Sequence, residues 1–415
     1  MSPRTDIGVG MVGYAFMGRA HSLAWHAVSR VFDPPLRPRL AAICGRDKAA
    51  AQAAASRLGW AAVETDWRAL IERDDVDLID ISAPGDMHAP IAIAALAAGK
   101  HVLCEKPLAN TLAEASAMND AAGAAYPGGA RAMVGFNYRR VPALALARQL
   151  VADGRLGILR HLRAVYLQDW LADPAAPMTW RMQAERAGSG ALGDLGSHLI
   201  DLARYLSGDE IAGVSALSAT FVGSRPWADD AKTEGLRRGR VTVDDAVVFT
   251  AKLASGALAS FEATRYATGR KNGLRIELNG SAGSLAFDLE RLNELEFFNV
   301  ADSDVLTYNE GVSGFRRVLV TEATHPYLAA WWPPGHTLGW EHTFTHQARD
   351  LLTAIADGTQ PRPSFADGLA VQRVLDAVQR SAANGNSWES VVNPLPPGDA
   401  GKSRHTENGR TKEVH

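Results

Sequence analysis

Short apolar runs alternate with alanine-rich helical segments along the first third of the chain. The runs lie at residues 7–12, 40–44, 78–82, 101–104 and 132–136, and the helical segments include 48–58, 67–72 and 90–98. Buried strands that alternate with helices are typical of a parallel sheet with helices on both faces. The pattern therefore predicts a doubly wound α/β domain over residues 1–137.

The periodicity changes after residue 137. A helix up to residue 153 is followed by segments that alternate apolar and polar positions, at 161–167, 214–221, 246–253, 257–264, 274–278, 284–287 and 295–300. Alternation with a period of two is typical of antiparallel strands with one buried face. We therefore expect residues 138–393 to form an α+β domain with a mostly antiparallel, open-faced sheet, closed by helices near 341–356 and 365–384. Residues 224–240 are expected to be a charged surface loop.

Composition excludes several functional classes. The 415 residues carry a formal net charge of −3, which provides no positive field for nucleic acid or anionic lipid. The two cysteines, Cys44 and Cys104, have no metal-binding or redox spacing, and no apolar stretch is long enough to cross a bilayer. These features predict a cytoplasmic protein without nucleic-acid or membrane partners. The polar tail, 394–415, is expected to be disordered.

A glycine-rich turn follows the first predicted strand. Gly13, Ala15 and Gly18 have the spacing of a dinucleotide fingerprint, in which the backbone approaches a pyrophosphate at the start of a helix. Ala15 stands where glycine is usual, and its methyl group fits only if the backbone there is not left-handed. The alternative is a tight strand–helix turn without a ligand.

The second predicted strand should end beside the adenosine ribose of such a cofactor. An acidic residue there would accept a hydrogen bond from the 2′-hydroxyl. The chain instead has Gly45 and Arg46, with Asp47 after them. Gly45 leaves room, and Arg46 could pair with a 2′-phosphate, which favours NADP. Stacking on adenine, or exposure to water, is the alternative for Arg46.

Two further segments carry candidate chemistry. Lys106, within Glu105-Lys106-Pro107, follows a short strand, and the carboxyl ends of parallel strands face the ligand crevice in such folds. On a later helix, Asp194, His198 and Asp201 fall within a stripe of about 60°. A histidine beside carboxylates can act as a tuned base. The alternatives are that Lys106 is simply solvated, and that Asp194 caps the helix while His198 lies on its surface.

Taken in order, these motifs resemble those of the Gfo/Idh/MocA family of oxidoreductases. The resemblance rests on the glycine turn through His21, on Pro84 with His88, on Glu105-Lys106-Pro107, and on Gly193-Asp194 with His198 and Asp201. It implies a Rossmann domain, an open-faced substrate domain, and a homodimer or homotetramer joined through that sheet. It also implies that Lys106, Asp194 and His198 are catalytic. Gly85 departs from the family, which often has asparagine after the proline.

The resemblance and the residue chemistry together predict which side chains contact ligands. Expected cofactor contacts are Gly13, Ala15, Phe16, Met17, Gly45, Arg46, Ser82, Pro84, His88, Glu105 and Lys106. Expected substrate contacts are Lys106, Asn137, Arg139, Gln168, Asp169, Arg181, Asp194 and His198. His342 and His346 lack a third ligand of convincing spacing, so no metal is expected.

The expected activity is the NAD(P)-dependent oxidation of a secondary hydroxyl of a sugar, anhydrosugar, glycoside or cyclitol to a ketone. His198 would take the hydroxyl proton, while Lys106 would donate to the same oxygen and Asp194 would orient the set. One alternative is an enzyme that acts on glycosides and uses bound NAD for transient oxidation. Another is a catalytically silent protein that only binds the cofactor.

Overall fold

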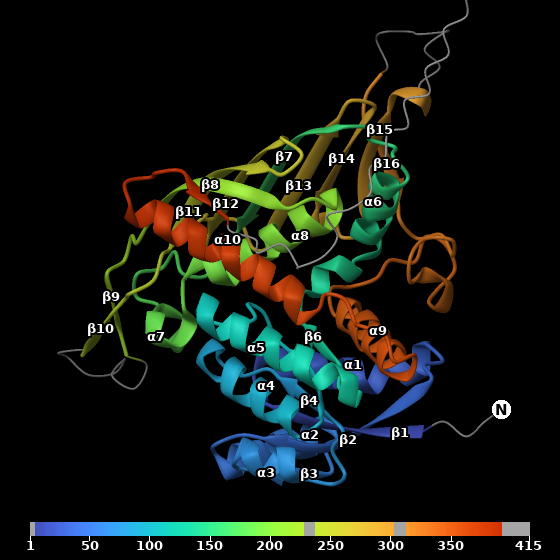
Figure 1. The fold of residues 1–415 in the computed structure, drawn as a ribbon, viewed down its shortest axis with the longest axis vertical. Helices are drawn as coiled ribbons and strands as arrows, with labels where there is room; N and C mark the ends of the chain where they lie inside the picture. Colours follow the sequence, from blue (N-terminus) through green and yellow to red (C-terminus); the bar gives the residue numbers. More distant parts are fainter. Residues whose placement is uncertain (1–4, 228–236, 303–312, 392–415) are drawn as a thin grey trace, which may run out of the picture.

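The computed structural model describes residues 5–227, 237–302 and 313–391. The predicted tail at 394–415 lies outside these residues. The described chain forms two large sheets, each with its own helices, and one two-stranded hairpin. Figure 1 shows the two large sheets stacked along the long axis of the molecule. None of the described helices is both long enough and apolar enough to cross a membrane.

The first sheet is parallel and has six strands in the order β3-β2-β1-β4-β5-β6. Its strands are β1 (Thr5–Val12), β2 (Leu36–Cys44), β3 (Ala62–Glu64), β4 (Leu78–Ile81), β5 (His101–Cys104) and β6 (Ala132–Val134). The connecting helices are α1 (Phe16–Val31), α2 (Lys48–Leu58), α3 (Trp67–Glu72), α4 (His88–Ala97) and α5 (Leu112–Ala125). The strand order reverses between β1 and β4, and ligands of open α/β sheets bind in the crevice at that point.

The second sheet has nine strands, in the order β16-β15-β14-β13-β7-β12-β11-β8-β17. Their bounds are β7 (Leu159–Leu167), β8 (Ile211–Ala219), β11 (Ala246–Leu253), β12 (Leu258–Thr264), β13 (Gly273–Gly280), β14 (Gly283–Asp288), β15 (Glu294–Asn299), β16 (Arg316–Leu319) and β17 (Glu389–Ser390). Neighbouring strands are antiparallel except for β7 and β12. The predicted fold class, a Rossmann domain followed by a mostly antiparallel open-faced sheet, is confirmed.

Helices cover one face of this second sheet. They are α6 (Pro142–Ala152), α8 (Ser197–Ser207) and α10 (Phe365–Ala383), and α10 also packs on α5 and β6 of the first domain (Figure 1). The opposite face carries exposed side chains of mixed character, among them Arg163, Val248 and Leu258. The expected open face is therefore present.

Two segments pack differently from the sequence prediction. Helix α9 (His342–Ala356) lies late in the chain but packs on α1, and its Leu351 and Leu352 join Trp25 in the core of the first domain. The expected surface loop at 224–240 is bounded by two short strands, β9 (Ser224–Pro226) and β10 (Arg238–Arg240), which pair as a small hairpin. Arg225 in β9 is buried and donates to the carbonyl oxygens of Leu171 and Asp173, which ties the hairpin to that segment.

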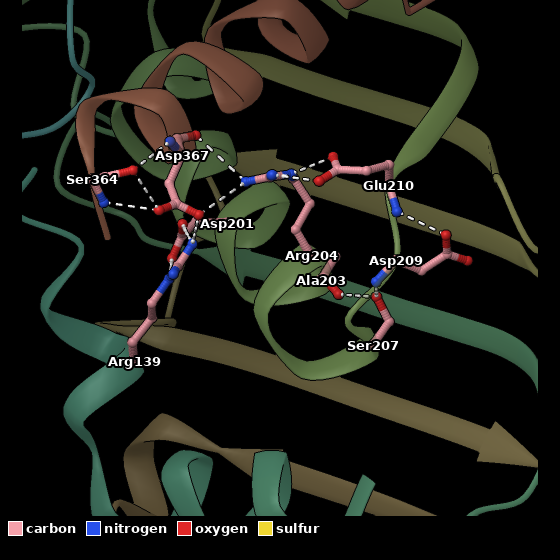
Figure 2. A network of polar contacts seen from close by, with 9 residues as sticks. All are labelled: Arg139, Asp201, Ala203, Arg204, Ser207, Asp209, Glu210, Ser364 and Asp367. Atoms are coloured by element: carbon pink, nitrogen blue, oxygen red, sulfur yellow. Dashed lines mark hydrogen bonds and ion pairs between the residues drawn. The ribbon is translucent and has the colours of Figure 1, made fainter. Parts of the chain in front are cut away.

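Arg139 lies in a buried ion-pair network instead of facing a ligand (Figure 2). Its Nε and Nη2 donate to the two carboxylate oxygens of Asp201 on α8, at 2.9 and 2.6 Å. Asp367 on α10 lies 3.5 Å from Nη2, and its other oxygen accepts from Ser364 at the helix cap. The expected substrate contact of Arg139 is therefore wrong, because the charged end of this side chain is used to hold α8 and α10 together.

We predict that Arg139→Met will lower the free energy of unfolding by about 3–5 kcal/mol, because it leaves the buried Asp201 carboxylate without its partner. Urea unfolding measures this change. The matched control is Arg37→Met, which removes a pair between exposed Arg37 and Asp6 and should cost far less, because solvent screens an exposed pair. Equal effects of the two substitutions would contradict a structural role for the Arg139 network.

Candidate active site

A cavity of about 1250 Å³ lies between the carboxyl ends of the Rossmann strands and the second domain. All of the residues expected to contact a cofactor line it, and so do Asn137, Gln168, Arg181, Asp194 and His198. Arg139 and Asp169 do not. Asp169 instead accepts from Lys271 Nζ at 2.7 Å and from the Gly269 amide at 3.0 Å, so the structure does not bring it to the cavity with the other expected substrate contacts.

The glycine turn between β1 and α1 has the geometry of a dinucleotide loop. Gly13 has a φ of 102°, and a Cβ there would lie 2.5 Å from the carbonyl oxygen of Ser82. Ala15 has a φ of −75°, so its methyl group causes no backbone strain. Ala15 caps α1 without a side-chain hydrogen bond, which leaves N–H groups at the positive end of the helix dipole for an anion.

Three buried side-chain oxygen atoms of residues that line the cavity have no hydrogen-bond partner within the described part of the chain. They are Ser82 Oγ, Asp86 Oδ1 and Asn110 Oδ1. A Cβ on Gly85 would lie 2.3 Å from Asn110 Oδ1, so the Asn110 amide occupies the space that a side chain at position 85 would need. Such unpartnered groups fit a polar ligand such as a dinucleotide. Sequence reasoning missed Asn110 because it lies outside every motif.

The end of β2 lacks a free carboxylate. Asp47 accepts from the Ala50 amide as the cap of α2, and Glu64 pairs with Arg73 at 2.8 Å. Arg46 is exposed and lines the cavity, and no ion pair to it is found among the described residues. Gly45 is required for a different reason than expected, because a Cβ there would lie 1.9 Å from the Tyr14 ring.

Lys106 crosses the junction between the two domains. It follows β5, and its Nζ lies 2.9 Å from the carbonyl oxygen and 3.3 Å from Oδ1 of Asp194. Asp194 lies in a π-helical turn, Leu192–Gly196, immediately before α8. Burial raises the pKa of the Asp194 carboxyl, but the positive charges of Lys106, Arg265 and Arg181 outweigh it and hold this pKa below its ordinary value. Asp194 is therefore a carboxylate at neutral pH.

His198 is buried in the first turn of α8, with its ring 4.5 Å from the ring of Tyr138. No hydrogen bond to the imidazole is found among the described residues. Burial, and then the charge of Lys106, lower the pKa of His198 well below its ordinary value. The ring is therefore neutral at pH 7, with a nitrogen free to accept a proton.

Tyrosine hydroxyls line the side of the cavity near His198. The Tyr138 and Tyr166 oxygens lie 2.8 Å apart, and Tyr166 donates to Asn272 Oδ1 at 2.7 Å. Gln168 donates to the same oxygen of Asn272 at 2.7 Å. Tyr138, in the 3₁₀ turn Asn137–Arg140, and Tyr166, on β7, were missed because their roles depend on contacts between segments far apart in the chain. Together these groups form a polar surface suited to hydroxyl-bearing ligands.

His88 and His346 have local structural partners. His88 lines the cavity, but its ring nitrogens lie 3.0 and 3.1 Å from the carbonyl oxygens of Pro107 and Ala83. Burial lowers the pKa of His88, so its neutral ring donates to only one of them. His346 accepts from Trp331 Nε1 at 2.8 Å, and its other nitrogen lies 2.9 Å from the Arg140 carbonyl oxygen. No group of residues able to hold a metal ion is found among the described residues.

Comparison with known proteins identifies both domains. Residues 7–135 match the model described as the oxidoreductase family, NAD-binding Rossmann fold, and residues 144–286 match the GFO/IDH/MocA C-terminal domain. Levoglucosan dehydrogenase of Pseudarthrobacter phenanthrenivorans is 43% identical over 396 residues, which cover 93% of this chain and 98% of that protein. Inositol 2-dehydrogenase of Rhizobium meliloti is a more distant relative, at 28% identity over 90% of this chain and 96% of that protein.

Solved structures agree with these relatives. An oxidoreductase domain protein from Kribbella flavida is 59% identical and covers 94% of this chain and 100% of its own, with a TM-score of 0.88. Levoglucosan dehydrogenase in complex with NADH and levoglucosan is 42% identical, with the same coverage and a TM-score of 0.87. Such identity over nearly the whole length, together with the motifs at Gly13, Lys106 and His198, means that the chain belongs to the Gfo/Idh/MocA family of oxidoreductases.

Proposed function

We propose that the protein is an NAD(P)-dependent dehydrogenase that oxidises a secondary hydroxyl of a sugar or anhydrosugar, such as levoglucosan, to a ketone. The observation that carries the proposal is the convergence of Lys106 and His198 on one cavity from two domains. The names of the relatives support the substrate class. Cyclitols and glycosides are the more distant candidates.

The chemistry assigns a different task to each of the three groups. A nicotinamide cofactor, when bound, supplies the hydride acceptor. Neutral His198 accepts the proton of the substrate hydroxyl. The Lys106 ammonium has three N–H donors, of which two are used on Asp194, and the third stabilises the negative charge that develops on the substrate oxygen. Asp194 holds the ammonium in place.

Assays of net reduced cofactor test this function. Levoglucosan, myo-inositol and a simple glucoside, each offered with NAD or NADP, should give a rise in the absorbance of the reduced cofactor with at least one sugar. A glycoside that is consumed without net reduction of cofactor would favour transient oxidation. Cofactor binding without turnover of any of these compounds would favour a silent binding protein.

We predict that Lys106→Ala and His198→Ala will each lower kcat by roughly 100-fold or more, because both groups act on the same substrate oxygen. The double variant should be little worse than the slower single variant. Steady-state kinetics measure these rates, with Lys48→Ala on the surface of α2 as the matched control.

The pH profile adds a readout specific to His198. Because the pKa of His198 is depressed, the activity of the wild-type enzyme should fall only well below pH 6.5. The pH profile of His198→Ala should lack this fall. Near-normal turnover of His198→Ala would contradict its role as the base.

We further propose that the enzyme accepts NADP at least as well as NAD. The support is local, namely exposed Arg46 and the use of the neighbouring Asp47 as a helix cap. The solved complexes of levoglucosan dehydrogenase contain NADH and lend no support to a preference for NADP.

We predict that Arg46→Ala will weaken NADP by about tenfold or more, and NAD much less, because only NADP carries the 2′-phosphate. Binding titrations measure both affinities, with exposed Arg57→Ala as the matched control. Equal losses for the two cofactors would instead indicate stacking on adenine. A wild-type enzyme with a strong preference for NAD would rule out the NADP proposal.

We also propose that two copies of the chain pack through the open face of the second sheet, as a dimer or within a tetramer. Apolar side chains gathered on an exposed sheet face mark an interaction surface, and Val248 and Leu258 are more than half exposed here. We predict that light scattering will give the mass of a dimer or tetramer at micromolar concentration, and that Val248→Glu will shift it toward the monomer. A wild-type protein that remains monomeric would contradict the proposal.

A further inference from the structure

A buried cluster of three ionisable side chains lies under the strand end that carries Lys106. His21 Nδ1 lies 2.9 and 3.0 Å from the two carboxylate oxygens of Asp80, and His21 Nε2 lies 3.1 Å from Glu105 Oε1. Trp25 Nε1 also donates to Asp80, at 2.8 Å. All three side chains of the cluster are at most 6% exposed, so water does not screen them appreciably.

The cluster carries one net negative charge. Both ring nitrogens of His21 face carboxylate oxygens. For both contacts to be hydrogen bonds, each nitrogen must carry a proton, so the ring is an imidazolium between two carboxylates. Burial lowers the pKa of His21, but the carboxylates of Asp80 and Glu105 outweigh it and raise this pKa to about 10. Moving one of the protons onto either carboxylate would leave the same net charge.

This charge faces the part of the cavity where hydride transfer takes place in the proposed reaction. Glu105 lines the cavity and immediately precedes Lys106. Gly135 leaves space for it, because a Cβ there would lie 2.7 Å from Glu105 Oε1. A substrate oxygen on Lys106 requires the nicotinamide ring close by, since reacting atoms must approach within about 3–3.5 Å. The charge of Lys106 itself is balanced by Asp194 at 3.3 Å.

We propose that the buried cluster of Asp80, His21 and Glu105 stabilises the oxidised cofactor relative to the reduced one, and so sets the ratio of their affinities. The reason is electrostatic, because the oxidised nicotinamide ring carries a positive charge that the reduced ring lacks. The inference rests on the proposed function for the position of the ring. It assigns Glu105 and Asp80 to the tuning of the cofactor, in addition to any contact that Glu105 makes with it.

The test is a pair of binding titrations, with NAD⁺ and with NADH, on the full-length protein without sugar. Glu105→Gln removes the nearer negative charge and keeps an oxygen acceptor for His21. Asp80→Asn removes the charge on the far side of the imidazole, away from the cavity. Glu105→Asp keeps the charge, and exposed Glu72→Gln is the matched control for the loss of a carboxylate elsewhere in the domain. Thermal melts verify that each variant is folded.

We expect Glu105→Gln to raise the ratio of the NAD⁺ to the NADH dissociation constant on the order of tenfold, which is the effect of one charge about 12 Å away at an effective dielectric of about 20. Asp80→Asn should shift the ratio in the same direction by a smaller factor, which keeps the test available if one variant does not fold. Glu105→Asp and Glu72→Gln should keep the wild-type ratio.

An unchanged ratio in Glu105→Gln and Asp80→Asn would overturn the inference and leave the proposed function standing. A shift in Glu105→Gln alone would also overturn it, because a direct contact of Glu105 would then explain the change without the charge of the cluster. A wild-type protein that binds neither cofactor would contradict the proposed function itself, and the inference with it.

Discussion

The contact between Lys106 and Asp194 is the constraint on which the geometry of the cavity depends. It joins the end of a Rossmann strand to the π-helical turn before α8, over 2.9 Å to a carbonyl oxygen and 3.3 Å to a carboxylate oxygen. The same turn sets the start of α8, and therefore the position of His198. Farther along α8, the buried pair of Asp201 with Arg139 also holds the helix. A cation in the cavity and a neutral base thus come from different domains, and the contact between Lys106 and Asp194 links their positions.

Burial and charge give the ionisable groups of the cavity distinct states at neutral pH. His198 stays neutral because burial and the charge of Lys106 both disfavour its protonation. His21 is a cation in an equally buried place because carboxylates face both of its ring nitrogens. The first histidine is suited to accept a proton, and the second to hold a fixed charge. The difference arises from the partners of each ring, since both rings are almost fully buried.

Much of the fold could be predicted from the sequence, because buried strands and alternating strands leave clear periodic patterns. The strand at 246–253, for example, is found at its predicted bounds. The site was harder to predict, since spacing places a side chain near a cavity without showing what else it binds. Arg139 and Asp169 were expected at the substrate, but Asp201 and Lys271 pair with them. Asn110 and Tyr138 were missed because their role depends on contacts between segments far apart in the chain.

The arrangement of one substrate oxygen between Lys106 and His198 can be measured directly. A crystal structure of the protein with NADH and levoglucosan would locate the hydroxyl that reacts. We predict that a single sugar oxygen lies within about 2.6–3.2 Å of both Lys106 Nζ and a ring nitrogen of His198. A sugar that is bound with its oxygen on Lys106 alone, and with His198 in contact only with the protein, would contradict it.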